Sequence, residues 1–93
     1  MAVQAKQIVV HGRVQGVGFR YYVRNAGMRL GLVGDVRNLP DSTVEIHVEG
    51  GAGKIDEFIK LVERGPSLSR VQRIEVFDTA VRGEYSSFLI EGW

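Results

Sequence analysis

The pattern of hydrophobic and polar residues changes its period several times along this chain. Over residues 43–49 the two classes alternate, in the series Val44, Glu45, Ile46, His47, Val48 and Glu49. A period of two is typical of a strand with one buried face and one face in water. The segment therefore predicts such a strand, with His47 exposed between two glutamates.

Two other segments repeat their apolar residues with the period of a helix. The apolar positions are Phe19, Val23, Ala26 and Leu30 in residues 19–30, and Ile55, Phe58, Ile59 and Val62 further along. Spacings of three and four place each set on one helix face. Both segments therefore predict amphipathic helices, which Gly31 and Gly65-Pro66 are suited to end. The glycine-rich residues 50–53 predict a flexible connection into the second helix.

Apolar segments at 7–11, 32–39, 69–77 and 88–90 predict four more strands, the first of them central in its sheet. Residues 40–42 predict a tight turn, which makes 32–39 and 43–49 a hairpin. The order is strand, helix, strand, strand, helix, strand, with a short C-terminal strand. This order predicts an α+β ferredoxin-like sandwich, an antiparallel sheet with two helices on one face.

Composition narrows the class of protein. A length of 93 residues predicts one domain, over residues 1–93, and the hydrophobic and charged fractions of 44% and 25% are ordinary for a soluble protein. The sequence has no cysteine, which excludes disulfides and cysteine nucleophiles and is compatible with a cytoplasmic location. No apolar run approaches the roughly 18 residues of a membrane span. We therefore expect a cytoplasmic monomer without a membrane anchor.

The charge distribution suggests a small anionic ligand. The net charge of +1 argues against a protein that coats nucleic acid. Residues 1–40 nevertheless hold six basic side chains and one acidic one, whereas residues 41–93 hold six basic and ten acidic ones. The positive N-terminal half is expected to attract anions.

The segment Gly12-Arg13-Val14-Gln15-Gly16-Val17-Gly18-Phe19-Arg20 joins the first predicted strand to the first predicted helix. Glycines adopt positive φ readily, and successive N–H groups before a helix form a site for anions. The planar guanidinium of Arg20 matches two oxygens of a phosphate. A glycine-rich turn with one arginine is also common as a plain turn, and Asn38 before Leu-Pro-Asp is common as a turn cap. The residues alone leave both interpretations open.

Together with Gly34-Asp35-Val36-Arg37-Asn38-Leu39-Pro40-Asp41 and Gly65-Pro66, this loop resembles the acylphosphatases, small ferredoxin-like hydrolases of carboxyl phosphates, over nearly the whole chain. The resemblance implies a substrate phosphate held by the loop backbone, that is by Gln15, Gly16, Val17, Gly18 and Phe19. It implies that Arg20 binds the phosphate and that Asn38 positions the attacking water. Ser42 departs from the family, which usually has glycine there.

The resemblance also implies the chemistry. An acyl phosphate is a reactive mixed anhydride, so positioning and charge stabilisation suffice for its hydrolysis. We therefore expect a small-molecule acyl phosphate substrate, inorganic phosphate as product and inhibitor, and neither metal nor cofactor.

Other functions fit the sequence less well. The loop at residues 12–20 lacks the dinucleotide fingerprint. Gly53-Lys54 is similar to the end of a P-loop, but Ile55 follows it where a P-loop requires Ser or Thr. His11 is interpreted as structural, and it has no metal-ligand spacing with His47. RNA binding by such a sheet requires exposed aromatic residues on central strands, which 7–11 lacks. A non-catalytic ligand-binding domain, like the one inside larger carbamoyl-transferring maturation proteins, stays open, although a chain of 93 residues favours an independent enzyme.

Overall fold

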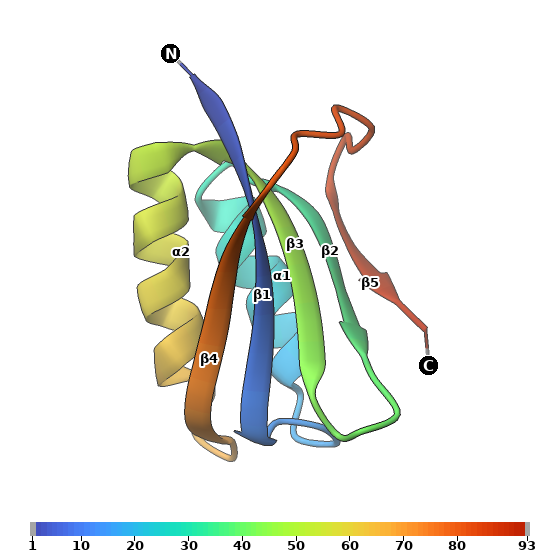
Figure 1. The fold of residues 1–93 in the computed structure, drawn as a ribbon. Coiled ribbons are helices and arrows are strands. Elements are labelled where there is room, and N and C mark those ends of the chain that lie inside the picture. The colour runs from blue at the N-terminus through green and yellow to red at the C-terminus, as the bar shows by residue number, and fades with distance from the viewer. Residues whose placement is uncertain (1, 93) are drawn as a thin grey trace.

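The computed structural model describes residues 2–92. Its elements in chain order are β1 (Val3–Arg13), α1 (Phe19–Arg29), β2 (Val33–Asn38), β3 (Val44–Gly51), α2 (Ala52–Arg64), β4 (Arg70–Thr79) and β5 (Phe88–Glu91). The strands form one sheet in the order β4-β1-β3-β2-β5, and both helices cover the same face of it (Figure 1). This arrangement confirms the predicted ferredoxin-like α+β sandwich.

Strand directions decide which loops meet. β3 is antiparallel to both of its neighbours, β1 and β2, so these two strands run parallel to each other. β5 pairs with β2 in parallel and makes the sheet mixed, whereas the other pairings are antiparallel as predicted. The C-terminal ends of β1, β2 and β5 therefore lie at one edge of the sheet, the lower edge in Figure 1.

The core lies between the sheet and the two helices. Its fully buried side chains include Ile8, Val10, Val36, Val44, Ile46 and Val48 from the sheet and Phe19, Val23, Ile55, Phe58 and Val62 from the helices. Each such side chain stabilises the fold by roughly 1.5–3 kcal/mol relative to an exposed one. The predicted helix faces are therefore the buried ones.

The predicted flexible connection at 50–53 is wrong, because β3 continues through Gly51 and α2 begins at Ala52.

Gly27 allows β5 to pack directly on α1. A Cβ atom added at Gly27 would overlap the ring of Phe88, and that ring is itself 3% exposed. This close packing is possible because residue 27 has no side chain. It holds the C-terminal strand against α1.

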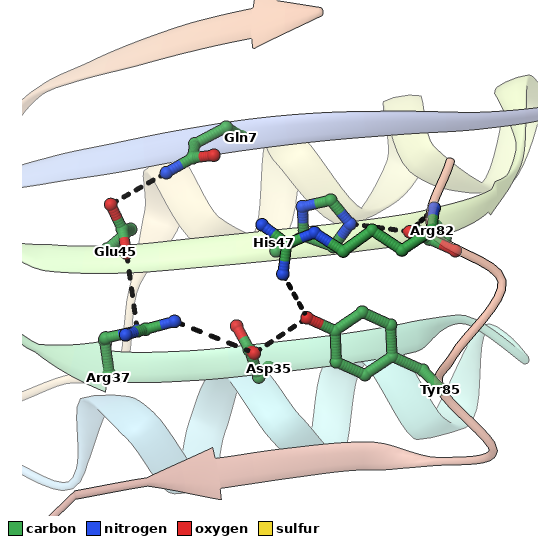
Figure 2. Close-up of polar contacts among 8 residues, drawn as sticks. Gln7, Asp35, Arg37, Glu45, His47, Arg82 and Tyr85 are labelled. Atoms are coloured by element: carbon green, nitrogen blue, oxygen red, sulfur yellow. Dashed lines mark hydrogen bonds and ion pairs between the residues drawn. The ribbon is translucent and has the colours of Figure 1, made fainter. Parts of the chain in front are cut away.

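The face of the sheet opposite the helices carries a network of polar side chains (Figure 2). Glu45 accepts a hydrogen bond from Gln7 Nε2 at 2.7 Å and forms an ion pair with Arg37, with Nε 3.3 Å from Oε1. The hydroxyl of Tyr85 donates to Asp35 Oδ2 at 2.8 Å. This network ties the connection between β4 and β5 to the middle of the sheet.

The prediction that His47 and Glu49 face water is wrong. Each is 3% exposed, because the connection after β4 lies over this face. The ring of Tyr85 stacks on His47 with 5.4 Å between centroids. Glu49 accepts hydrogen bonds from the His47 ring at 2.6 Å and from the main-chain N–H groups of Arg82 and Gly83 at 2.8 and 3.2 Å. The alternation in 43–49 correctly separates the two faces, but it does not reveal that a distant segment covers the polar one.

The pH dependence of stability is expected to report these contacts. Burial alone would raise the pKa of Glu49, but hydrogen bonds from Arg82 N–H, the His47 ring and Gly83 N–H together lower it below 4.5. A carboxylate whose pKa is lower in the folded than in the unfolded protein stabilises the fold at pH values above its unfolded-state pKa. This stabilisation is lost as the pH falls through the folded-state pKa. The free energy of unfolding is therefore expected to fall below about pH 4.5.

Urea unfolding between pH 3 and pH 7 measures this effect. The fall is expected to be smaller in Glu49→Gln than in the unsubstituted protein, whereas Glu63→Gln, at an exposed position on α2, keeps it. Equal pH slopes for Glu49→Gln and the unsubstituted protein would contradict the role assigned to this carboxylate.

The turn between β2 and β3 is tight, as predicted. Leu39 N–H donates to Thr43 O at 2.9 Å, and Asp41 Oδ1 accepts from the main-chain N–H and the hydroxyl of Thr43 at 3.1 and 2.6 Å. These two hydrogen bonds lower the pKa of Asp41, the hydroxyl contributing most. Ser42 completes the turn with a φ of 77°.

Ser42→Gly is expected to stabilise the protein. A left-handed φ costs a non-glycine residue about 1–2 kcal/mol, and glycine's larger unfolded-state entropy offsets about half of this. The net gain of about 0.5–1 kcal/mol corresponds to a rise in Tm of a few degrees, which calorimetry measures. Ser67→Gly, at a described residue without a positive φ, is the control and is expected to lower Tm slightly. A Tm that falls equally in both variants would refute the explanation.

Candidate active site

The loop between β1 and α1 turns at two glycines. Gly16 has a φ of 72° and Gly18 a φ of 76°, and a Cβ added at either would meet no atom within 4 Å. Conformation rather than space therefore requires glycine here. The predicted glycine-rich turn is present and leads directly into α1.

The N-terminus of α1 is open to an anion. Gly18 is the N-cap, with no side-chain hydrogen bond to the helix, and the first turn has no acidic residue. The first main-chain helical bond runs from Tyr22 N–H to Gly18 O, so the preceding N–H groups of the helix have no intrahelical acceptor. These groups and the positive end of the helix dipole favour a bound anion.

Arg20 is half-buried at the second position of α1. Its Nη1 donates to the main-chain oxygen of Glu91, at the end of β5, at 2.9 Å. This contact uses one of the five guanidinium donors, and none of the other four binds a residue in the range 2–92. The C-terminal strand thus orients the arginine, a role that local sequence motifs do not indicate.

Asn38 is the last residue of β2 and lies at the same edge of the sheet, because β1 and β2 run parallel. Its Oδ1 atom is buried and accepts no hydrogen bond from any of residues 2–92. A buried carbonyl oxygen without a donor costs about 1–3 kcal/mol. Such an orphaned acceptor indicates a site for a water molecule or a ligand.

One pocket brings these features together. It has a volume of about 110 Å³ and is lined by Val14, Gly16, Gly18, Phe19, Arg20, Tyr21 and Asn38. Pockets that bury a drug-sized ligand occupy roughly 300–1,000 Å³, so this one suits a group as small as a phosphate. A larger hollow of about 320 Å³ lies between residues 3–6 and 78–81, but Lys6 and Asp78 pair with each other there.

The predicted site residues divide into two groups. Gly16, Gly18, Phe19, Arg20 and Asn38 line the pocket, whereas Gln15 and Val17 do not. Val17 packs against the core, and the Gln15 side chain reaches the β2–β3 turn. Among the lining residues, Tyr21 is one that the sequence did not single out; its 60% exposed side chain directly follows Arg20.

Three further features bear on the class of protein. His11 Nε2 lies 2.6 Å from Glu75 Oε2, a contact that supports its structural interpretation. Within residues 2–92 no group of three His, Cys, Asp or Glu side chains could hold a metal ion. Neither of the two described helices is long and apolar enough to cross a membrane.

Comparison with known proteins gives a consistent result. The family model for acylphosphatase matches residues 6–90. An acylphosphatase of Koribacter versatilis is 43% identical over 96% of this chain and 81% of that protein. The crystal structure of an acylphosphatase from Bacillus subtilis superimposes with a TM-score of 0.92 at 36% identity, over 96% of this chain and 99% of that one.

A longer protein contains a similar unit. Full-length HypF, in a phosphate- and nucleotide-bound form, matches with a TM-score of 0.87 and 39% identity over 98% of this chain but only 12% of the HypF chain. The family model matches most of this chain, and free-standing relatives match over most of their own length. These two matches establish the family. This chain belongs to the acylphosphatase family.

Proposed function

We propose that the pocket at the N-terminus of α1 binds the phosphoryl group of an acyl phosphate and promotes its hydrolysis. Family membership makes the chain an acyl phosphate hydrolase; the roles of the residues are our proposal. The observation that carries it is the lining of one small pocket by the glycine turn, Arg20 and Asn38. These are an anion-binding backbone, a cation and an amide.

Each group has one task in this mechanism. The main-chain amides of Gln15, Gly16, Val17, Gly18 and Phe19 and the guanidinium of Arg20 hold the non-bridging phosphoryl oxygens. Asn38 Oδ1, the orphaned acceptor, takes a hydrogen bond from the attacking water and orients it.

The reaction is a displacement at phosphorus. The water oxygen bonds to phosphorus, the bond from phosphorus to the carboxylate oxygen breaks, and the carboxylate leaves. A phosphoryl oxygen of the substrate accepts the proton of the water. The enzyme supplies position and positive charge, which suffice for a substrate with so good a leaving group.

The proposal needs neither metal nor cofactor, and it places the activity in a cytoplasmic monomer. Residues of one chain suffice to form the pocket, and a protein without cysteine is compatible with a reducing compartment.

The test measures carboxylate and phosphate release from acetyl phosphate and benzoyl phosphate, with a reaction without protein as the control for spontaneous hydrolysis. We expect stoichiometric products, no effect of EDTA, and competitive inhibition by inorganic phosphate. Loss of activity in EDTA that magnesium or zinc restores would refute the metal-free mechanism. Phosphate binding without turnover would favour a ligand-binding domain.

A further inference from the structure

The side chain of Gln15 joins the phosphate loop to the turn that follows Asn38. Its Nε2 donates two hydrogen bonds, to the main-chain oxygens of Leu39 and Thr43, each at 2.9 Å. A carboxamide nitrogen has two hydrogens, so both are used. The side chain is therefore fixed in one orientation, against the β2–β3 turn, and it does not line the pocket.

The two acceptors lie in the β2–β3 turn, which begins directly after Asn38. Leu39 directly follows Asn38 in the chain, and Leu39 N–H donates to Thr43 O, which closes the turn. Between residues 14–18 and 38–43 of the described chain, no other hydrogen bond links the loop to this turn. The Gln15 carboxamide is thus the polar connection between the anion-binding loop and the segment that holds Asn38.

We propose that Gln15 is a positioning residue, whose side chain sets the place of Asn38 relative to the phosphate loop. This inference rests on the proposed function, since it assumes that Asn38 orients water toward a phosphoryl group in that loop. Geometry of this kind has a large effect on rate, because a misplacement of about 1 Å can lower turnover by about 10²-fold. Phosphate binding depends on the loop and Arg20, and is expected to be less sensitive.

The main variant is Gln15→Met, which keeps the length of the side chain and removes both donors. We expect kcat to fall by about tenfold or more, with the inhibition constant for inorganic phosphate changed by less than about threefold. Gln7→Met is the matched control, because Gln7 donates one hydrogen bond to Glu45 on the opposite face of the sheet. It is expected to retain full turnover.

A double-mutant cycle separates positioning from general loosening of the loop. If Gln15 acts through Asn38, then Gln15→Met lowers kcat little further in an Asn38→Ala background. Additive losses, or an increase in the phosphate inhibition constant that matches the loss in kcat, would overturn the proposal. Gln15→Glu, which sets a carboxylate against the two carbonyl oxygens, is the second variant and is expected to lower kcat at least as far.

Hydrogen exchange in the unsubstituted protein is independent of any variant and of turnover. The carboxamide protons of Gln15 are expected to exchange more slowly than those of Gln72, which is exposed on β4. Equal exchange rates would overturn the link. If this link is present but the protein hydrolyses no acyl phosphate, the proposed function fails and the positioning role fails with it. If the unsubstituted protein hydrolyses acyl phosphates and Gln15→Met does so equally well, the positioning role alone is refuted.

Discussion

Replacement of Arg20 by alanine is expected to reduce acyl phosphate hydrolysis by at least about 10²–10³-fold, the effect of removing one strong donor from a charged reaction centre. Phosphate binding is expected to weaken as well, because the substitution removes the principal cation of the pocket. Arg20→Lys is expected to recover little of either property, since an ammonium group is a point charge that cannot reproduce two parallel N–H donors.

Arg20→Ala and Arg20→Lys are compared by initial rates, by phosphate inhibition and by circular dichroism. Both are expected to fold, because Arg20 is only half-buried and its one hydrogen bond to residues 2–92 is to the Glu91 carbonyl. Arg29→Lys, in the last turn of the same helix, is the matched control and is expected to retain full activity. A folded Arg20→Lys protein with unchanged kcat and KM would remove Arg20 from the phosphate site.

Asn38→Ala is expected to separate turnover from binding. If the amide orients water, kcat falls by roughly 10²-fold or more, whereas phosphate inhibition changes little because the loop amides and Arg20 remain. The side chain is only half-buried and its Oδ1 accepts no hydrogen bond from the described residues, so the fold is expected to be kept.

The measurement sets hydrolysis rates beside phosphate inhibition constants for Asn38→Ala and for Asn25→Ala, a control at an exposed position on α1. Full turnover in Asn38→Ala would exclude the water-positioning role. A parallel loss of binding and turnover would instead assign Asn38 to the binding of phosphate.

Much of this architecture could be predicted because its signals are local. The helix faces follow from spacings of three and four, and the 43–49 strand from a period of two. The family is confirmed by the comparisons, and its two motifs place Arg20 and Asn38, which the structure brings into one pocket. They meet because β1 and β2 both pair antiparallel with β3 and so end at the same edge.

The features that could not be predicted are contacts between segments far apart in the chain. The Glu91 carbonyl reaches Arg20 because β5 lies parallel to β2, and no local pattern specifies which strand β5 pairs with. Tyr85 and the segment around it turn a polar strand face into a buried one, which contradicts the exposure that alternation suggests for His47. The alternation of apolar and polar residues assigns each side chain to a face of the sheet, whereas its burial depends on which other segments cover that face.

Titration of the isotopically labelled protein with inorganic phosphate, followed by amide NMR, tests the central claim most directly. We predict saturable shifts at the amides of residues 15–20 and at the Asn38 side chain, with a Kd equal to the constant for competitive inhibition of acyl phosphate hydrolysis. Shifts confined to the other helix N-terminus, at residues 51–54, or a Kd unrelated to the inhibition constant, would contradict the assignment of this pocket as the active site.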